Sequence, residues 1–266
     1  MATTTRGLDS QGYIAREGSL DLIQQEFRPL VTAARDQLLS AFGPRMTSLY
    51  LYGSVPRGTA RPGRSDLDVL IALSDEPTGE DRSAAKALAE SLDKGSPQID
   101  GVGLLIVSRT QVLSDLERHD LGWFVACLCT PLLGEDLAEH LPRYRPDALL
   151  ARETNGDLAL FLPRWRERIA RGDDPRTLDR LMSRHLVRTG FTLVMPRWNG
   201  WTSDLTRMAE VFGTYYPQRA DEMRRAAEAA YEPTGAPHTL RTYTEDLGPW
   251  LAAEYEAVHG LKAPRP

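Results

Sequence analysis

Two short β-rich runs, joined by a stretch of turn residues, constrain the fold of this chain most. The first run, MTSLYLYGS, begins at Met46 and is stopped by Gly53, and the second, DLDVLIAL, ends at Leu73. The connection between them, PRGTARPGRS, is rich in proline, glycine and serine, which favour turns over regular structure. The pattern therefore predicts two successive strands.

Helices and a further strand flank this pair. Apolar residues recur at helical spacing over about 20–42, until a Gly-Pro pair ends the pattern, and again over 81–92. Pro29 marks a kink or a fresh helix start within the first segment. After KGSP, the run QIDGVGLLIVS predicts a third strand over 98–108. The predicted order is helix, strand, strand, helix, strand.

Beyond Thr110 the pattern indicates helices alone, separated by proline and glycine. We expect them at about 110–118, 121–129, 147–171, 175–194, 204–213, 217–230 and 239–259. The whole chain thus predicts an α+β fold, in which an N-terminal mixed-sheet domain precedes an all-helical C-terminal domain. The proline-rich segment LPRYRPD is either a domain boundary or a tight loop inside one domain. As a boundary, it gives domains over 1–143, with a core of about 20–115, and over 144–266.

Composition narrows the class of protein. The formal net charge is −5, which argues against long nucleic-acid partners because phosphate backbones are bound by an excess of Lys and Arg. No apolar run approaches the ~20 residues of a membrane span, and the N-terminus MATTTRGLDSQG lacks the hydrophobic segment of a secretion signal. We therefore expect a cytoplasmic protein, monomeric or homodimeric, with no membrane partner and with Cys127 and Cys129 buried in the core.

Asp66 and Asp68 lie two residues apart at the head of the second β-rich run. Alternate side chains of a strand point to the same face, so these carboxylates are presented side by side while Leu67 points the other way. Adjacent carboxylates repel each other unless a cation lies between them. Magnesium prefers oxygen ligands and binds through one or two carboxylates together with substrate phosphates. We therefore expect a magnesium site, the alternative being a solvated pair of surface acids.

The turn before these acids suits a phosphate group. Gly53 allows backbone amides to approach closely, Ser54 offers a hydroxyl and an amide, and the Arg57 guanidinium can reach phosphate oxygens. A helix beginning near Ser54 would add its positive end. Ser65, just before the acids, completes the candidate nucleotide-binding residues. Asp100 is expected beside the pair, as a further metal ligand or as the acceptor of a hydroxyl proton, unless it only stabilises a turn.

The segments GSVPRG and SDLD resemble the signature of the polymerase-beta-like nucleotidyltransferase superfamily. That signature pairs a glycine–serine turn with two acids separated by one residue and a third acid on a neighbouring strand. Gly53, Ser54, Asp66 and Asp68 match it, and the resemblance covers about residues 20–115. A catalytic domain followed by a helical domain, at this total length, resembles the architecture of the aminoglycoside nucleotidyltransferases.

The resemblance implies a magnesium-dependent nucleotidyltransferase. Such an enzyme transfers a nucleoside monophosphate, here expected to be AMP, from a nucleoside triphosphate to a hydroxyl of a small molecule such as an aminoglycoside-like compound. The hydroxyl attacks the α-phosphorus and pyrophosphate leaves, with two Mg²⁺ ions held by Asp66, Asp68 and Asp100. Antibiotic resistance is the role that the resemblance brings to mind, and the sequence leaves the physiological role open.

Two alternatives keep the resemblance but change the role. An antitoxin-type enzyme would AMPylate a partner protein, although such antitoxins are usually little more than a catalytic domain. A catalytically silent module would only bind nucleotide, although it would have no need for the repulsion between Asp66 and Asp68.

The helical half offers weaker candidates for substrate contacts. Glu153 and Asp157 lie four residues apart in the predicted helix 147–171, hence on one face, where they orient a hydroxyl or hold a cationic substrate, or else only face solvent. Arg184 and Arg188 have the same spacing and would either meet the triphosphate or form surface ion pairs.

Trp198 and Trp201 flank Asn-Gly in a predicted loop. Their rings could stack on a base or a sugar, but hydrophobic anchoring is the more common role of tryptophan.

Overall fold

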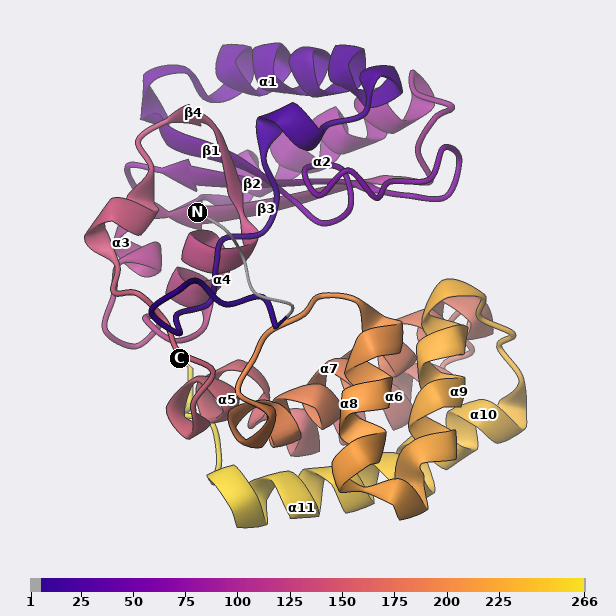
Figure 1. The fold of residues 1–266 in the computed structure, drawn as a ribbon. Coiled ribbons are helices and arrows are strands. Elements are labelled where there is room, and N and C mark those ends of the chain that lie inside the picture. Colours follow the sequence, from indigo (N-terminus) through magenta and orange to yellow (C-terminus); the bar gives the residue numbers. More distant parts are fainter. Residues whose placement is uncertain (1–5, 266) are drawn as a thin grey trace. The chain divides into compact units, whose positions relative to one another are not determined.

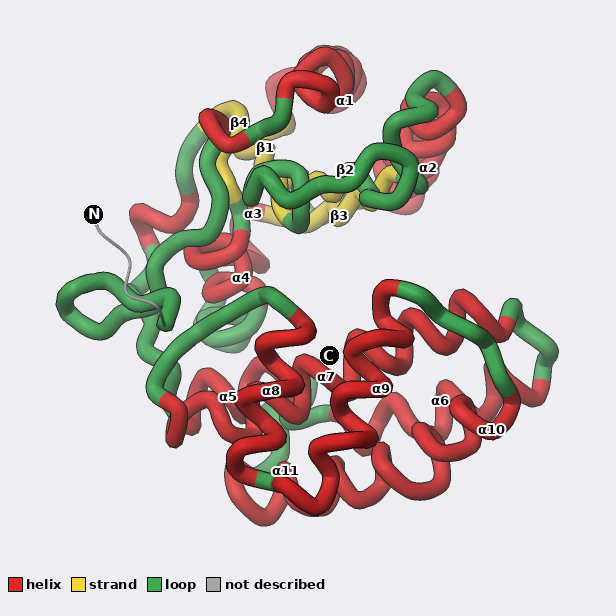
Figure 2. The backbone as a smooth tube through the Cα atoms, turned by 45° about the vertical axis from the view of Figure 1, so that its right-hand side comes forward, coloured by secondary structure: helices red, strands yellow, loops and turns green. Residues whose placement is uncertain are grey.

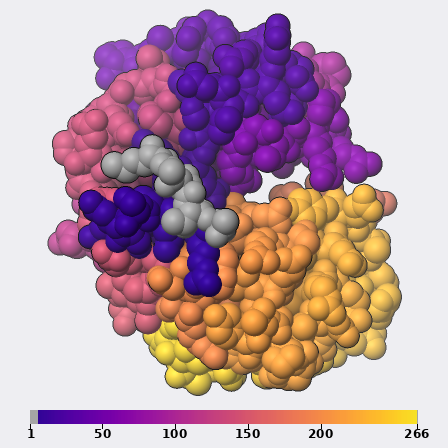
Figure 3. Space-filling view, in the orientation of Figure 1, coloured from indigo at the N-terminus to yellow at the C-terminus, as the bar shows by residue number. Residues whose placement is uncertain are grey.

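The structure is a computed structural model that describes residues 6–265. Contacts within the chain define two compact units, one formed by residues 15–144 and the other by residues 6–14 together with 145–265 (Figure 1). The first described residues therefore belong with the helical part of the chain, where the backbone amide of Trp201 donates to the carbonyl of Arg6 at 2.8 Å. Figure 3 shows indigo atoms of this segment against the orange helical residues. The predicted limits of 1–143 and 144–266 remain a prediction.

A four-stranded mixed sheet organises the unit of residues 15–144. Its strands are β1 (Met46–Tyr52), β2 (Leu67–Leu73), β3 (Val102–Ser108) and β4 (Thr130–Gly134), arranged in the order β3-β2-β1-β4. β2 pairs parallel with β3, whereas β1 pairs antiparallel with both β2 and β4. The first three strands were predicted from the sequence, and the mixed sheet is confirmed.

The edge strand β4 corrects the prediction that only helices follow Thr110. Its sequence, TPLLG, contains Pro131, which cannot donate a ladder hydrogen bond and is therefore confined to sheet edges or irregular positions. The ladder between β1 and β4 has an irregular register at Leu49 and Tyr50, next to this proline. Because a proline within a five-residue run disfavours a strand in pattern analysis, this edge strand was not predicted.

Two helices cover one face of the sheet (Figure 2). α1 (Arg28–Phe42) begins at the turn containing Pro29, so this proline is a helix start rather than a kink, and two 3₁₀ turns replace the predicted helix over 20–27. α2 (Gly79–Lys94) begins with a capping box between Thr78 and Asp81. Their apolar faces enclose a core with the odd-numbered residues of β2, namely Leu67, Val69, Ile71 and Leu73.

The opposite face of the sheet packs against α3 (Arg109–Val112) and α4 (Leu121–Leu128). Their core includes Tyr50 of β1, Leu70 and Ala72 of β2, and the buried residues Val107, Val112, Val125, Cys129 and Leu137. Cys129 lies in this core and Cys127 is likewise buried, as predicted. Even-numbered residues of β2 therefore face α3 and α4.

The remaining unit is built from helices, as predicted. They are α5 (Ala148–Asn155), α6 (Leu158–Ala170), α7 (Pro175–Trp198), α8 (Leu205–Tyr215), α9 (Ala220–Tyr231), α10 (Pro237–Thr242) and α11 (Gly248–His259), with a π-helical turn (Tyr243–Leu247) before the last. α7 contributes the largest run of buried side chains. Within residues 6–265, no helix combines the length and hydrophobicity needed to cross a membrane.

Trp198 and Trp201 are structural anchors of this helical unit. Both rings meet the fully buried ring of Phe191 edge-on, with centroid separations of 5.8 and 5.5 Å. Asn199 takes a left-handed backbone conformation, φ 53°, and ends α7. Of the two roles considered from the sequence, hydrophobic anchoring accounts for the rings in this structure.

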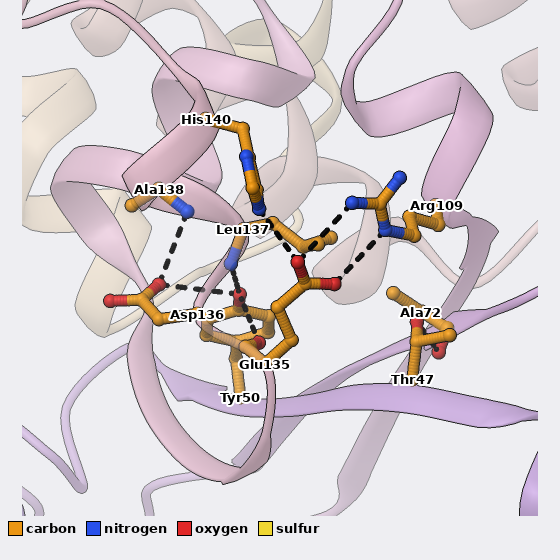
Figure 4. A network of polar contacts seen from close by, with 9 residues as sticks. All are labelled: Thr47, Tyr50, Ala72, Arg109, Glu135, Asp136, Leu137, Ala138 and His140. Carbon is orange, nitrogen blue, oxygen red and sulfur yellow. Dashed lines mark hydrogen bonds and ion pairs between the residues drawn. The ribbon is translucent and has the colours of Figure 1, made fainter.

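A network of hydrogen bonds and ion pairs holds the segment that follows β4 in place (Figure 4). The buried Tyr50 hydroxyl accepts a hydrogen bond from the Leu137 amide at 2.6 Å. Glu135 accepts from Arg109 at 3.0 Å and contacts a ring nitrogen of His140 at 2.6 Å. Asp136 forms a two-pronged ion pair with Arg16, at 2.6 and 3.0 Å. The pairs attach this segment to β1, α3 and the chain before α1.

We expect this network to make the fold acid-sensitive. Hydrogen bonds from Arg109 and His140 lower the pKa of Glu135 from 4.5 to about 2. Burial raises the pKa of Asp136, but the pair with Arg16 outweighs it and the net shift is downward. Both groups bind protons more readily in the unfolded chain, so their stabilisation is present above about pH 4.5 and is lost as pH falls toward 2.

The check is the melting temperature measured between pH 6 and 3, for the wild-type chain and Glu135→Gln. Between pH 6 and 3 the melting temperature of the variant should fall by less than that of the wild type, because the variant lacks one of the titrating carboxyl groups. An identical loss in both proteins would contradict the assignment to Glu135.

Candidate functional site

Asp66 and Asp68 lie where β2 begins. Asp68 is the second residue of the strand and pairs with Tyr52 at the end of β1, while Asp66 immediately precedes the strand. Leu67 packs into the core under α1 and α2, as the alternation of strand side chains predicts. The two partly buried acids are therefore presented together on the opposite face of the sheet, at its end.

Glycines surround both carboxylates. A β-carbon added at Gly53, directly after β1, would collide with Asp68 Oδ2, and one added at Gly103 on β3 would lie 2.8 Å from Asp68 Oδ1. On the same side, a β-carbon at Gly101 would lie 3.4 Å from Asp66 Oδ1. Glycine within a strand often marks a place where another group approaches the backbone closely. The acids thus lie over bare backbone on both neighbouring strands, facing the glycine turn.

These two carboxylates fit a magnesium ion. They supply hard oxygen ligands from one face, and Gly53 and Gly103 leave the Asp68 carboxylate the space that a β-carbon would take. Two carboxylates, completed by substrate phosphates and water, are an ordinary magnesium ligand set in nucleotide enzymes.

The turn after β1 is held by its own backbone. Gly53 has φ 78°, a conformation that favours glycine. The Gly58 amide donates to the Val55 carbonyl and the Thr59 amide to the Ser54 carbonyl, each at 3.1 Å. The expectation of a helix starting near Ser54 is wrong, because these bonds close turns and no helix follows within 53–60. Any phosphate contact here would use turn amides and the Ser54 side chain.

Two other candidate nucleotide ligands already have protein partners. Arg57 forms an ion pair with Glu17 at 3.1 Å, so it would have to share its guanidinium with a phosphate. The Ser65 hydroxyl accepts a hydrogen bond from the Arg61 amide at 2.9 Å and thereby closes the loop before the acids. Ser65 therefore has a structural role at the entrance to β2.

Asp100 does not complete a three-acid group. It lies in the loop before β3, exposed, with its amide bonded to the Ser65 carbonyl at 3.1 Å. Within the part of the chain that the structure describes, no three His, Cys, Asp or Glu side chains are clustered as a metal site would require. The reason is register, because the β3 residue paired with Asp68 is Gly103. Asp100 as a third metal ligand therefore stays a prediction, and the fit to a metal ion is argued here from Asp66 and Asp68 alone.

Glu153 and Asp157 do not share a helix face. α5 ends at Asn155 and Asp157 immediately precedes α6, because Gly156 breaks the predicted helix 147–171. Glu153 is buried and pairs with Arg152 at 2.9 Å and with Arg265 at 3.1 Å. Its role is to bind the C-terminal segment.

Asp157 and Arg188 instead meet at a cavity of about 350 Å³ within the helical unit. Asp157 pairs there with Lys262 at 3.2 Å. His185 also faces the cavity, with the rings of Phe161 and Trp165 packed edge-on against its imidazole, and burial lowers its pKa to about 4. Other lining residues are Thr154, Asn155 and Leu181. Arg184 is not among the lining residues, although Arg188 is.

Sequence reasoning overlooked Gly101, which directly precedes β3, and Gly103, which lies in β3. The signal was present, because the run DGVGLL carries glycines two apart in a predicted strand, as the acids are in SDLD. Recognising it required the parallel register of β2 and β3, which pairs Asp68 with Gly103.

Two comparisons relate this chain to known proteins. Residues 33–109 match a family model described as a nucleotidyltransferase domain. The crystal structure of spectinomycin adenyltransferase AAD(9) from Enterococcus faecialis, with ATP and spectinomycin, matches with a TM-score of 0.56 and 13% sequence identity, over 86% of this chain and 98% of that one. No curated protein gives a significant sequence match.

The family match covers the segment that contains β1, β2 and β3, together with both acids of the site. At 13% identity, the likeness to the solved structure shows a shared fold. Residues 33–109 of this chain therefore match a nucleotidyltransferase domain, and the fold of the chain resembles that of spectinomycin adenyltransferase AAD(9).

Proposed function

We propose that this protein is a magnesium-dependent nucleotidyltransferase, which transfers AMP from ATP to a hydroxyl of a small molecule. The observation that carries the proposal is the position of Asp66 and Asp68 over the glycines of two neighbouring strands, inside a nucleotidyltransferase domain. The choice of ATP and of a small acceptor is supported by the shared fold with an enzyme whose structure contains ATP and spectinomycin.

The reaction is an in-line displacement at the α-phosphorus. A bond forms between the acceptor oxygen and this phosphorus, the bond to the bridging oxygen breaks, and pyrophosphate leaves while the hydroxyl loses its proton. Magnesium bound at Asp66 and Asp68 supplies charge neutralisation for the phosphates. The chain's own contributions are the two carboxylates, the amides of the turn at Gly53, and the Ser54 side chain.

We further propose that the acceptor is an aminoglycoside-like compound, that the reaction takes place in the cytoplasm, where nucleoside triphosphates are available, and that it confers antibiotic resistance. The cavity beside Asp157, Arg188 and His185 is a candidate for contacts to this acceptor, because it combines an aromatic wall with groups that donate and accept hydrogen bonds.

The test is to incubate the purified protein with each of the four nucleoside triphosphates, Mg²⁺ and a panel of aminoglycosides and other hydroxylated compounds. We expect ATP to yield pyrophosphate and a product heavier than the acceptor by one adenylyl group, detected by mass spectrometry. Reactions without acceptor and reactions with EDTA are the controls. Adenylylated protein in place of adenylylated small molecule would favour a protein-modifying enzyme, and no product with any nucleotide would contradict the proposal.

A further inference from the structure

Gly103 occupies the position on β3 that lies directly beside Asp68. The parallel register pairs these residues, and the place where a Gly103 side chain would begin is taken by the Asp68 carboxylate. A β-carbon there would lie 2.8 Å from Asp68 Oδ1, closer than a carbon and an oxygen approach without overlap. The present position of Asp68 and a side chain at residue 103 therefore exclude each other.

We propose that Gly103 is a positioning residue for Asp68, because the absence of a side chain at residue 103 allows the Asp68 carboxylate to lie against β3. The inference rests on the proposed function only for the identity of the metal. Its geometric basis is local, because Asp68 is confined between Gly53 on one side and Gly103 on the other. A methyl group at residue 103 would turn the carboxylate away from β3 and alter the oxygen positions offered to a cation.

Gly103 is a cleaner probe of this arrangement than Gly53. Gly53 has φ 78°, so any substitution there also strains the backbone. Gly103 has no such φ and lies in a regular strand, where alanine is tolerated as well as glycine. The effect of Gly103→Ala is thus confined to the carboxylate that it displaces.

Gly101 provides a matched control. It lies two residues earlier on the same side, and a β-carbon there would lie 3.4 Å from Asp66 Oδ1, an ordinary van der Waals contact. Gly101→Ala therefore adds the same methyl group beside the other acid without displacing it. The difference in Mn²⁺ binding between the two variants therefore measures the effect of displacing the Asp68 carboxylate.

The experiment measures binding of Mn²⁺ alone, by electron paramagnetic resonance, to the wild-type chain, Gly103→Ala and Gly101→Ala, together with their melting temperatures. We expect Gly103→Ala to weaken Mn²⁺ binding by on the order of 10-fold or more, the range seen when the support of a metal ligand is lost. Its melting temperature should stay within about 4 °C of the wild type. Gly101→Ala should change Mn²⁺ binding by less than about 2-fold, because its contact is ordinary.

Equal Mn²⁺ binding by Gly103→Ala and the wild type would overturn the positioning role, and would leave the proposed transfer reaction intact. Unfolding of Gly103→Ala would overturn it too, since it would mark a packing role. If the binding differences appear as expected but no nucleotide is transferred by the wild type, the proposed function fails while the positioning role stands. Failure of the wild type to bind Mn²⁺ would contradict both.

Discussion

Asp68→Asn is expected to lower the rate of nucleotidyl transfer by about 10³-fold or more, because it removes a charged metal ligand from a site with two carboxylates. The fold should survive, since asparagine has nearly the same shape and the exchange relieves repulsion between neighbouring acids. Pyrophosphate release, measured at saturating ATP and acceptor, gives the rate, and thermal melting reports the fold. The matched control is Asp93→Asn, which changes an exposed acid on α2 and should leave the rate unchanged.

Retention of substantial activity by Asp68→Asn would remove the basis of the proposed mechanism. A rise in melting temperature without any transfer activity in the wild type would instead favour a silent nucleotide-binding module, because there the second acid would only destabilise the fold.

The largest expected effect on stability is at Phe191 in α7. Its ring is fully buried and two tryptophans meet it edge-on, so Phe191→Ala would leave a cavity and remove both ring contacts. The expected loss is about 3–5 kcal/mol in the free energy of unfolding. Urea denaturation followed by tryptophan fluorescence measures it. Leu160→Ala, at a side chain that is 63% exposed, is the control and should lie within about 0.5 kcal/mol of the wild type.

A loss below about 1 kcal/mol for Phe191→Ala would mean that the surrounding helices collapse onto the vacated space. It would also reopen a ligand-stacking role for Trp198 and Trp201, because their rings would then not be needed to complete the core.

The sheet was predictable where strand and turn signals coincide. β1 and β2 carry apolar residues on both faces and are bounded by glycine or by turn residues, so their limits follow from the sequence. β4 was not predictable because Pro131 interrupts a short edge strand whose pairing is made with a distant segment. Similarly, a continuous helical pattern over 147–171 conceals the break at Gly156, which depends on contacts from the C-terminal segment.

The candidate site was predictable as far as it is local in sequence. Asp66, Asp68 and Gly53 lie within sixteen consecutive residues, and strand alternation suffices to place the two carboxylates on one face. The distance of Asp100 from the pair depends on the register of β3, which no local pattern specifies, so its role as a third ligand stays a prediction. Asp157 and Arg188 meet only through the packing of α6 and α7, so their spacing along the chain contained no hint of the cavity they share.

The buried Glu153 gives residues 260–265 an unexpected importance. Burial raises the pKa of this carboxyl, but hydrogen bonds from Arg152, Arg265 and the Ala263 amide outweigh that effect and lower it. Removal of residues 260–265 would take away two of these three partners and leave an acid enclosed in protein with one arginine beside it. This segment therefore acts as a counterion for the helical unit, and an affinity tag is better placed elsewhere than within it.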